Sequence, residues 1–281
     1  MEPYPKFDLA KYFGVASTAD IPWGHAINSR QLLAESLQAD IMLGTFLLSL
    51  RCAASSSTPL LPLTYCSLMC LPGFAEADIC VADSDPNRII MSHPPVRESD
   101  ITLFEWIDLV LDHCSKHPSQ KVGMKLDFKD PPAVAPALAH LADLYRKGAL
   151  NIPLWVNADI LDASGRKPPF NPETFLSTVQ TLLPGLVLSV GWTTLPTLPY
   201  TMAQIEEMLA ICKQHDLKYT TFPMRACLCR ASEAPLRALL EADPTYTLTV
   251  WAGHEKMTPE DYEWVKQSFD NSRIYMDVKG F

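Results

Sequence analysis

The chain lacks an excess of positive charge. Its 281 residues include 23 lysines and arginines against 32 aspartates and glutamates, giving a net charge of −9 at pH 7. Proteins that bind the nucleic-acid backbone usually present a basic face, so this balance argues against nucleic acid as a partner. It leaves room for a small phosphate ester, because a bound metal ion can supply the positive charge that such a ligand needs.

The chain also lacks a long apolar run and a recognisable targeting segment. The longest apolar run, residues 41–50, is about half of the ~20 residues that a membrane-spanning helix requires, so we expect no transmembrane segment. Residues 1–17 contain no apolar stretch behind a basic start, which predicts that no secretory signal is present. Both absences favour a cytoplasmic location.

The eight cysteines lack the spacing of a disulfide framework or a zinc site. Cys227 and Cys229 are separated by one residue, and Cys66 and Cys70 by three, with no second pair of matching spacing. Reduced thiols in a cytosolic protein are the simplest interpretation.

What the chain does contain is an alternation of short apolar runs with amphipathic stretches. Eight runs predict strands at 21–27, 75–81, 122–128, 153–159, 186–192, 218–224, 246–251 and 273–278. Seven stretches between them predict helices at 29–38, 102–114, 133–147, 172–182, 201–215, 233–241 and 259–269. Ser99 or Asp100 is the expected N-cap of the second helix, with Glu105 in its first turn. The alternation predicts an α/β fold, a (β/α)8 TIM-type barrel formed by residues 1–281 as one domain, with a last helix that is short or absent.

Polar residues that are unusual in strands collect at the predicted strand ends. In a (β/α)8 barrel, functional groups gather at the C-terminal ends of the strands. In chain order these residues are His25, Asn28, Glu76, Asp78, His93, Lys125, Asp127, Lys129, Asn157, Asp159, Trp192, Arg225 and Trp251. Such groups on so many strands predict a functional site at the mouth of the barrel.

Three carboxylates are candidate metal ligands. Side chains alternate across a strand, so Glu76 and Asp78 share one face, as do Lys125, Asp127 and Lys129. If both sets face inward, unpaired charges would be very costly, and a divalent cation bound by Glu76, Asp78 and Asp127 removes that cost. Ligation by oxygen alone suits Mg²⁺ or Ca²⁺ better than zinc.

The remaining polar residues are candidates for catalysis and substrate binding. His25 and His93 at the rim of the mouth could act as a general acid and base, and Lys129 could add positive charge beside a phosphate oxygen. The candidates for substrate binding are Asn28, Lys125, Asn157, Asp159, Trp192, Arg225 and Trp251.

Each of these residues also has a purely structural interpretation. A carboxylate pair on a strand is often ion-paired with a neighbouring lysine, and a histidine at a strand end is more often structural than catalytic. The segment from Lys125 to Lys129 could be a solvated edge strand. Trp192 and Trp251 could serve packing, and Arg225 could neutralise a nearby aspartate without any ligand. The convergence of several strands on one mouth favours the functional interpretation.

Eight segments of the chain resemble one known family. The segments WGHAIN, EADICVADS, IIMSHPP, TLFEWIDLVL, GMKLDFKD, PLWVNADIL, LSVGWTT and TFPMRA resemble the menorin family (family with sequence similarity 151), in particular its short B-type branch. The resemblance covers nearly the whole chain outside residues 44–75 and keeps the order of the motifs. The menorin family is in turn similar to glycerophosphodiester phosphodiesterases and other phospholipase-C-like barrels.

The phosphodiesterase resemblance implies roles for individual residues. Those enzymes have a His at the end of strand one, Glu-x-Asp on strand two, a His in the next loop, and Glu-x-Lys on strand three. The matching residues here are His25, Glu76 with Asp78, His93, and Asp127 with Lys129. The resemblance therefore implies metal ligands at the three carboxylates and acid–base roles for the two histidines.

The chain departs from the phosphodiesterase pattern at two places. Ala26 and Ile27 stand where phosphodiesterases usually have Arg-Gly, so the phosphate-gripping arginine is missing from its usual position. Asp127 stands where they have the longer Glu.

Three functions therefore remain open. The first is a metal-dependent phosphodiesterase. The second is a catalytically silent barrel that acts as a binding partner in extracellular or developmental signalling, including neuronal and photoreceptor settings, as some relatives do outside the cell. A third is binding of a sugar or lipid headgroup, with Trp192 and Trp251 as stacking surfaces.

Residues 44–75 interrupt the family's second strand. In the family an apolar triplet runs directly into Glu-Ala-Asp, whereas residues 41–43 are here separated from Glu76 by a segment rich in Leu, Pro, Ser and Cys. These residues have pyrimidine-rich codons, as expected before a splice acceptor. We hypothesise that residues 44–75 are translated intron or a gene-model error, the alternative being a genuine lid loop. In the chain as it stands, only the residues just before Glu76 could replace the lost start of the strand.

Overall fold

The computed structural model describes residues 2–37, 73–253 and 255–278. Within these residues nine strands form one sheet, and eight of them pair in parallel in the order β1-β2-β4-β5-β6-β7-β8-β9. The ninth, β3, pairs antiparallel with β2. The strands are β1 (Trp23–Gly24), β2 (Gly73–Val81), β3 (Ile89–Met91), β4 (Val122–Phe128), β5 (Leu154–Asp162), β6 (Val187–Thr193), β7 (Thr221–Arg225), β8 (Thr247–Trp251) and β9 (Ile274–Asp277).

Helices follow the parallel strands and cover the outside of the sheet. Residues 30–37 are helical. The further helices are α1 (Leu9–Phe13), α3 (Leu103–Lys116), α4 (Val134–Arg146), α5 (Pro172–Leu182), α6 (Met202–Gln214), α7 (Ala226–Cys229), α8 (Glu233–Glu241) and α9 (Pro259–Ser268). Short 3-10 turns are η1 (Thr18–Asp20), η2 (Pro131–Ala133), η3 (Arg230–Ser232) and η4 (Asn271–Arg273). None of the described helices is long and apolar enough to cross a membrane.

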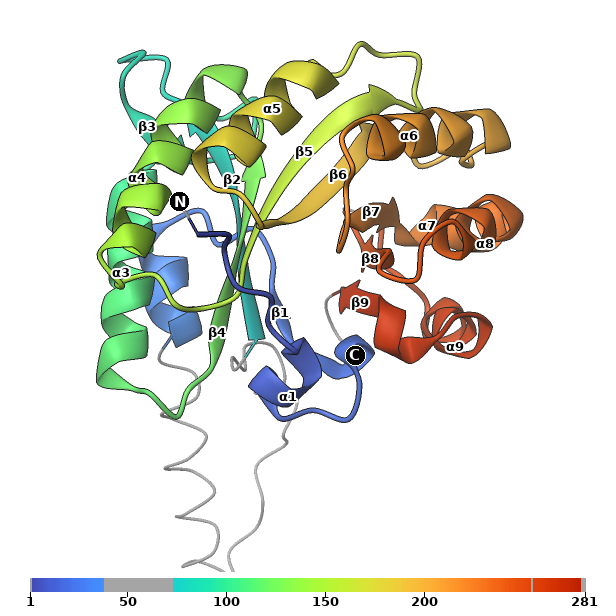
Figure 1. Ribbon diagram of the computed structural model, residues 1–281, viewed down its shortest axis with the longest axis horizontal. Helices are drawn as coiled ribbons and strands as arrows, with labels where there is room; N and C mark the ends of the chain where they lie inside the picture. Colours follow the sequence, from blue (N-terminus) through green and yellow to red (C-terminus); the bar gives the residue numbers. More distant parts are fainter. Residues whose placement is uncertain (1, 38–72, 254, 279–281) are drawn as a thin grey trace, which may run out of the picture.

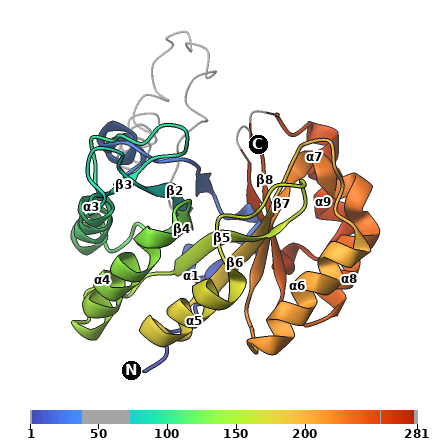
Figure 2. The ribbon, with the colours of Figure 1, turned by 90° about the horizontal axis from the view of Figure 1, so that it is seen from above.

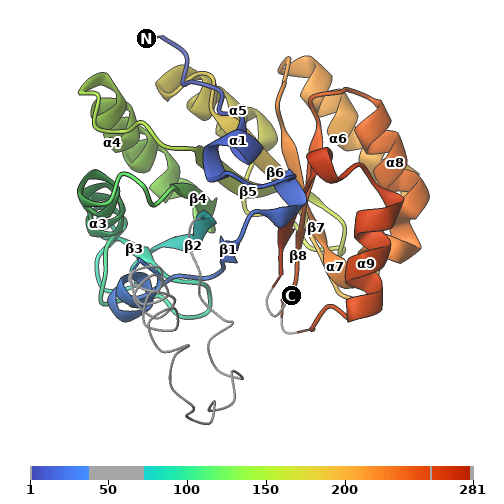
Figure 3. The same ribbon diagram turned by 90° about the horizontal axis from the view of Figure 1, so that it is seen from below.

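The first and last strands bring the sheet round into a nearly closed barrel. Figure 1 shows α3, α4 and α5 on one side of the strands and α6, α8 and α9 on the other. Seen from above and from below, the helices again lie outside the strands (Figures 2 and 3). β1 and β9 lie side by side where the ends of the sheet meet. The predicted (β/α)8 TIM-type barrel is thus confirmed, with strand ends that differ from the predicted ones by a few residues.

Local sequence signals account for where the helices begin. Thr102 caps α3 in a capping box with Glu105, so the expected cap at Ser99 or Asp100 was wrong by a few residues. A second capping box, Thr201 with Gln204, begins α6. The sequence did not predict α1, α7 or β3, which are short and carry little periodic signal. The last helix, expected to be short or absent, would follow β9. Residues 279–281 of that segment lie outside the described part of the chain.

Strand β2 begins in the segment that separates Glu76 from residues 41–43. Gly73, Phe74 and Ala75 pair in parallel with β4, and Phe74 and Ala75 also pair with β1. These three residues therefore supply the start of the strand. The other residues of the proposed insertion, 44–72, lie outside the described residues, and the intron hypothesis stays a prediction.

Aromatic side chains fill the lower end of the barrel. Trp23 stacks on Phe74 with ring centroids 4.6 Å apart, Phe74 lies 4.5 Å from Trp155, and Trp155 lies 4.7 Å from Tyr275. Gly123 is required beside them, since a Cβ there would lie 2.8 Å from the Phe74 ring. We call Trp23, Phe74, Trp155 and Tyr275 the aromatic floor.

Candidate metal and acid–base site

A layer of polar side chains lies directly above the aromatic floor. Because inward-facing residues on a strand are two apart, each floor residue is followed by an inward polar residue. These are His25 after Trp23, Glu76 after Phe74, Asn157 after Trp155 and Asp277 after Tyr275. The register pairs Glu76 with Lys125, and Asp78 with Asp127, so the polar residues of β2 and β4 lie at matching heights.

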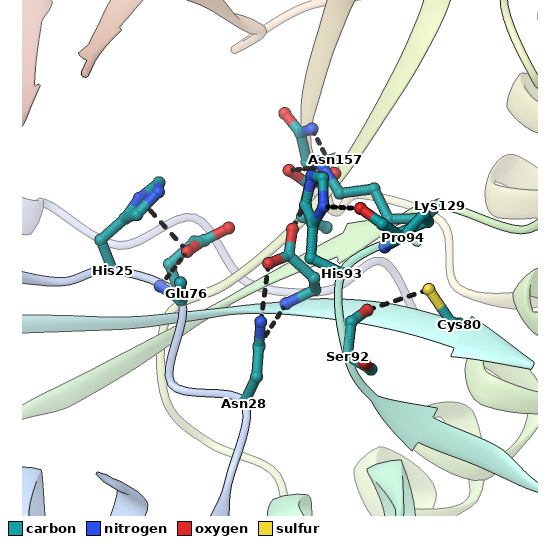
Figure 4. Close-up of polar contacts among 12 residues, drawn as sticks. His25, Asn28, Glu76, Cys80, Ser92, His93, Pro94, Lys129 and Asn157 are labelled. Atoms are coloured by element: carbon teal, nitrogen blue, oxygen red, sulfur yellow. Dashed lines mark hydrogen bonds and ion pairs between the residues drawn. The ribbon is translucent and has the colours of Figure 1, made fainter. Parts of the chain in front are cut away.

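The lower part of this layer joins the first and last strands. His25 Nδ1 lies 3.1 Å from both carboxylate oxygens of Asp277 and 3.3 Å from Glu76 Oε2. Figure 4 shows the His25 ring turned toward Glu76. The buried Lys125 Nζ lies 3.7 Å from Asp277 Oδ2 and 5.8 Å from the centre of the Trp23 ring. Two carboxylates thus face one ammonium and one imidazole.

The charges of this lower group balance when His25 is protonated. Asp277, and to a lesser degree Glu76, raise the pKa of His25 to about 9 against the opposing effect of burial. Burial alone would raise the pKa of Asp277, but His25 and Lys125 hold it below its usual value. Burial raises the pKa of Glu76, with His25 acting in the opposite direction. The histidine is therefore a cation at neutral pH in the absence of a bound metal.

The upper part of the layer holds two aspartates and one lysine. Lys129 Nζ lies 2.8 Å from Asp127 Oδ2 and 3.1 Å from Asp78 Oδ1. Asn28 donates to Asp78 Oδ2 at 2.8 Å and accepts from the Asp78 backbone N–H at 2.9 Å. Asn157 donates to Asp127 Oδ1 at 2.8 Å. The two asparagines thus fix the orientation of both aspartates.

Glu76, Asp78 and Asp127 form a group that suits a hard divalent cation. One carboxylate oxygen from each lies within 4.8 Å of the others. Glu76 and Asp78 are buried, and the Asp127 side chain is 14% exposed. Taken together, the layer sets four carboxylates (Glu76, Asp78, Asp127 and Asp277) against Lys125, Lys129 and protonated His25, which leaves one excess negative charge. Carboxylate oxygens are the donors that Mg²⁺ and Ca²⁺ prefer.

A second group within the same distance, His25, Glu76 and Asp277, is a poorer metal site. Its ligand atoms also lie within 4.8 Å of one another. Lys125 and protonated His25 already compensate its two carboxylates, so the charge that would attract a cation is absent there. We therefore assign the candidate metal position to Glu76, Asp78 and Asp127.

Comparisons with known proteins agree with the motif resemblance. The family model for the menorin N-terminal domain matches residues 67–280. The chain belongs to the menorin family. The human protein FAM151B is 34% identical to it over 212 residues, which cover 72% of this chain and 73% of the human protein. The crystal structure of a "putative glycerophosphodiester phosphodiesterase" from Galdieria sulphuraria is similar with a TM-score of 0.48 at 13% identity, covering 73% of this chain and 80% of that one.

In this menorin-family chain, His93 lies in the loop after β3. It follows β3, and the preceding residue is held by a hydrogen bond from the Ser92 N–H to the Asp78 carbonyl at 2.9 Å. The His93 side chain is exposed, and its Nδ1 lies 2.5 Å from the Pro94 carbonyl oxygen (Figure 4). Among the described residues, no hydrogen bond joins His93 to His25 or to the three carboxylates.

Three of the residues predicted to contact substrate are almost fully buried. Lys125 and Asn157 are each 3% exposed; Lys125 is in register with Glu76, and Asn157 is in register with Asp127. Trp192 is 2% exposed and packs against Tyr200 and Phe222, so it offers no stacking surface. Lys125 and Asn157 contact the carboxylates of Asp277 and Asp127, and their role in substrate binding stays a prediction. Trp192 belongs to the core.

The remaining candidates lie nearer the opening. Asp159 is partly exposed, and burial raises its pKa to about 7 although Lys129 acts in the opposite direction. Arg225 lies 4.5 Å above the centre of the Trp251 ring, pairs with Glu255 at 2.6 Å and donates to Thr194 at 3.2 Å. The arginine thus forms its direct ion pair with Glu255, and its charge also acts to lower the pKa of Asp159.

Sequence reasoning missed Asp277, the principal partner of His25. The signal was available, since the predicted strand 273–278 carries a carboxylate near its C-terminal end, where functional groups of a barrel collect. Glu255 was missed as well, because it lies in a loop with no neighbouring motif.

Proposed function

We propose that this menorin-family chain hydrolyses a phosphodiester with the help of a divalent cation, Mg²⁺ or Ca²⁺. One observation carries the proposal: the oxygens of Glu76, Asp78 and Asp127 converge within 4.8 Å, and Glu76 also lies 3.3 Å from His25 Nδ1. A cation-binding group and a group that transfers protons thus share one carboxylate at the barrel mouth. Phosphodiester cleavage needs both functions within reach of one substrate.

Each residue of the site would have a separate role in the reaction. A cation held by Glu76, Asp78 and Asp127 would stabilise negative charge on the phosphate oxygens. His25, held through Nδ1 by Asp277, keeps Nε2 for proton transfer. The contact of its Nδ1 with the Asp277 carboxylate favours the protonated imidazole, which can supply the proton that a leaving alkoxide needs. His93 is proposed as the base that activates water.

A panel of phosphodiesters assayed with the purified chain tests this proposal. We expect hydrolysis with Mg²⁺ or Ca²⁺, none in EDTA, and a loss of about a hundredfold or more in His25→Ala, the usual range for a general acid. His117→Ala, at the C-terminal end of α3 and outside the site, is the matched control. Absence of hydrolysis of every diester with either cation would contradict the proposal.

A second candidate is a catalytically silent barrel that acts as a binding partner. The observation that favours it is Ala26, which stands where phosphodiesterases have an arginine. Its backbone N–H donates to Glu76 Oε2 at 2.7 Å, with φ at 57°. Calorimetry separates the two functions, since a silent barrel would bind the cation, or a sugar or lipid headgroup, without turnover of any diester.

A further inference from the structure

The Lys129 ammonium forms ion pairs with two of the three carboxylates that would bind a divalent cation. Its ammonium lies between Asp127 Oδ2, at 2.8 Å, and Asp78 Oδ1, at 3.1 Å. Both residues belong to the oxygen triad assigned to the cation. An ammonium and a divalent cation bound to the same oxygens, in a partly desolvated mouth, repel each other strongly. The ammonium is therefore an internal competitor of the metal.

A displaced ammonium needs another anion, and Asp159 is the carboxylate in place for it. Asp159 lies on β5, two residues after Asn157, and so on the same inward face. Against the opposing effect of burial, Asp127, Asp78 and Asp159 raise the pKa of Lys129, and only the last of these carboxylates lies outside the triad. The Asp159 side chain makes no hydrogen bond or ion pair with any group of the described residues.

The surroundings of Asp159 keep its carboxylate accessible. Its strand neighbour in register is Gly191. A Cβ at position 191 would lie 3.1 Å from Asp159 Oδ1 and 2.6 Å from the Pro223 ring, so glycine preserves the space beside the carboxylate. A lysine side chain can move within this region because four rotatable bonds carry its ammonium.

We propose that a divalent cation displaces the Lys129 ammonium from Asp78 and Asp127, and that Asp159 is the positioning residue that receives it. The inference rests on the cation site of the proposed function and adds a built-in exchange of cations to it. In the loaded state Lys129 pairs with Asp159 at the mouth, where its charge faces a bound phosphate. In the unloaded state the same ammonium lowers the cost of burying the two aspartates.

Calorimetric titration of Mg²⁺ and of Ca²⁺ into the full chain tests the exchange. We expect Lys129→Met to bind the cation about tenfold more tightly or better, because the internal competitor is gone; tenfold corresponds to about 1.4 kcal/mol. We expect Asp159→Asn to bind about tenfold more weakly, because the displaced ammonium loses its acceptor. Asp159→Glu should restore most of the affinity. Lys213→Met and Asp108→Asn, both on exposed helix positions, are the matched controls.

A double-mutant cycle separates a positioning residue from a direct ligand. If Asp159 acts through Lys129, Asp159→Asn has no effect on affinity in the Lys129→Met background. If Asp159 were itself a ligand, the loss would be equal in both backgrounds, which would overturn the proposal. Should Lys129→Met fail to fold, as judged by circular dichroism, Lys129→Gln has the same expected result.

The outcomes for this inference and for the proposed function are distinct. A wild-type chain that binds the cation with the same affinity as Lys129→Met overturns the exchange alone. A chain in which neither the wild type nor Lys129→Met binds Mg²⁺ or Ca²⁺ overturns the cation site as well. Binding by Lys129→Met without measurable binding by the wild type supports the exchange.

Discussion

His25 Nδ1 lies 3.1 Å from both carboxylate oxygens of Asp277, so the end of β1 is tied to the end of β9. These strands are the first and last of the parallel series, and they lie side by side at the one place where the barrel has to close. The candidate acid–base pair is therefore formed by closure of the barrel itself. A chain that closes its barrel incorrectly cannot assemble the pair.

Asp277→Asn should lower the pKa of His25 toward its ordinary value. Asp277 is the largest cause of the elevation, and an amide keeps the shape of the carboxylate while removing its charge. An NMR titration of the imidazole in EDTA, with Asp108→Asn as control, measures the change. A His25 pKa that stays at about 9 would show that Glu76 rather than Asp277 holds the proton.

The unloaded protein should lose stability as the pH rises from about 6.5 to about 9. Asp277 raises the pKa of His25 from 6.5 to about 9, so its stabilising contribution is complete below pH 6.5 and is lost as the pH passes through about 9. The contribution is at most about 3 kcal/mol. Urea unfolding in EDTA should show this loss in the wild type and its absence in His25→Gln. Parallel curves for the two proteins would contradict the assignment.

Mg²⁺ or Ca²⁺ should raise the melting temperature, and loss of the triad should abolish the effect. A ligand that binds only the folded state stabilises it by mass action, by about 2.7 kcal/mol at a hundredfold excess over Kd. Glu76→Ala combined with Asp78→Ala removes two of the three ligands, and Asp78→Asn alone is a gentler variant that keeps the side-chain volume. A cation-dependent shift that persists in the double variant would exclude the triad as the binding site.

Gly123→Ala should destabilise the protein by about 1–3 kcal/mol, the usual cost of overpacking a core. The added Cβ would lie 2.8 Å from the Phe74 ring, which the aromatic floor holds on both sides. Phe74→Leu opens space next to Gly123, so the double variant should lose less stability than the sum of the single losses. Thermal or urea unfolding of the four proteins measures this coupling.

The strands were predictable because their apolar runs are long and regular, and the short elements were not. Five-residue α1, four-residue α7 and three-residue β3 carry too few residues to show a period. Thr102 was missed as a cap because Ser99 and Asp100 offer the same chemistry a few residues earlier. Tertiary packing decides between such neighbours.

Individual residues of the candidate site could be predicted from the sequence, but the contacts between them could not. Alternation along β2 and β4 indicated that Glu76, Asp78 and Asp127 share one face, and the structure brings them together. The same alternation places Trp192 on the opposite face from Ser189, which donates to Asn157 inside the barrel. Trp192 could thus have been recognised as a core residue, whereas the His25–Asp277 contact spans 252 positions and depends on strand closure.

The aromatic floor has a consequence for the proposed hydrolysis of a phosphodiester. Because Trp23, Phe74, Trp155 and Tyr275 fill the barrel beneath the charged layer, the described residues give a ligand one way in, from the mouth. Both halves of a cleaved diester would have to depart through the opening by which the substrate arrived. The half released last would then act as a competitive product inhibitor, so its chemical nature could be learned from inhibition alone, before the substrate is known.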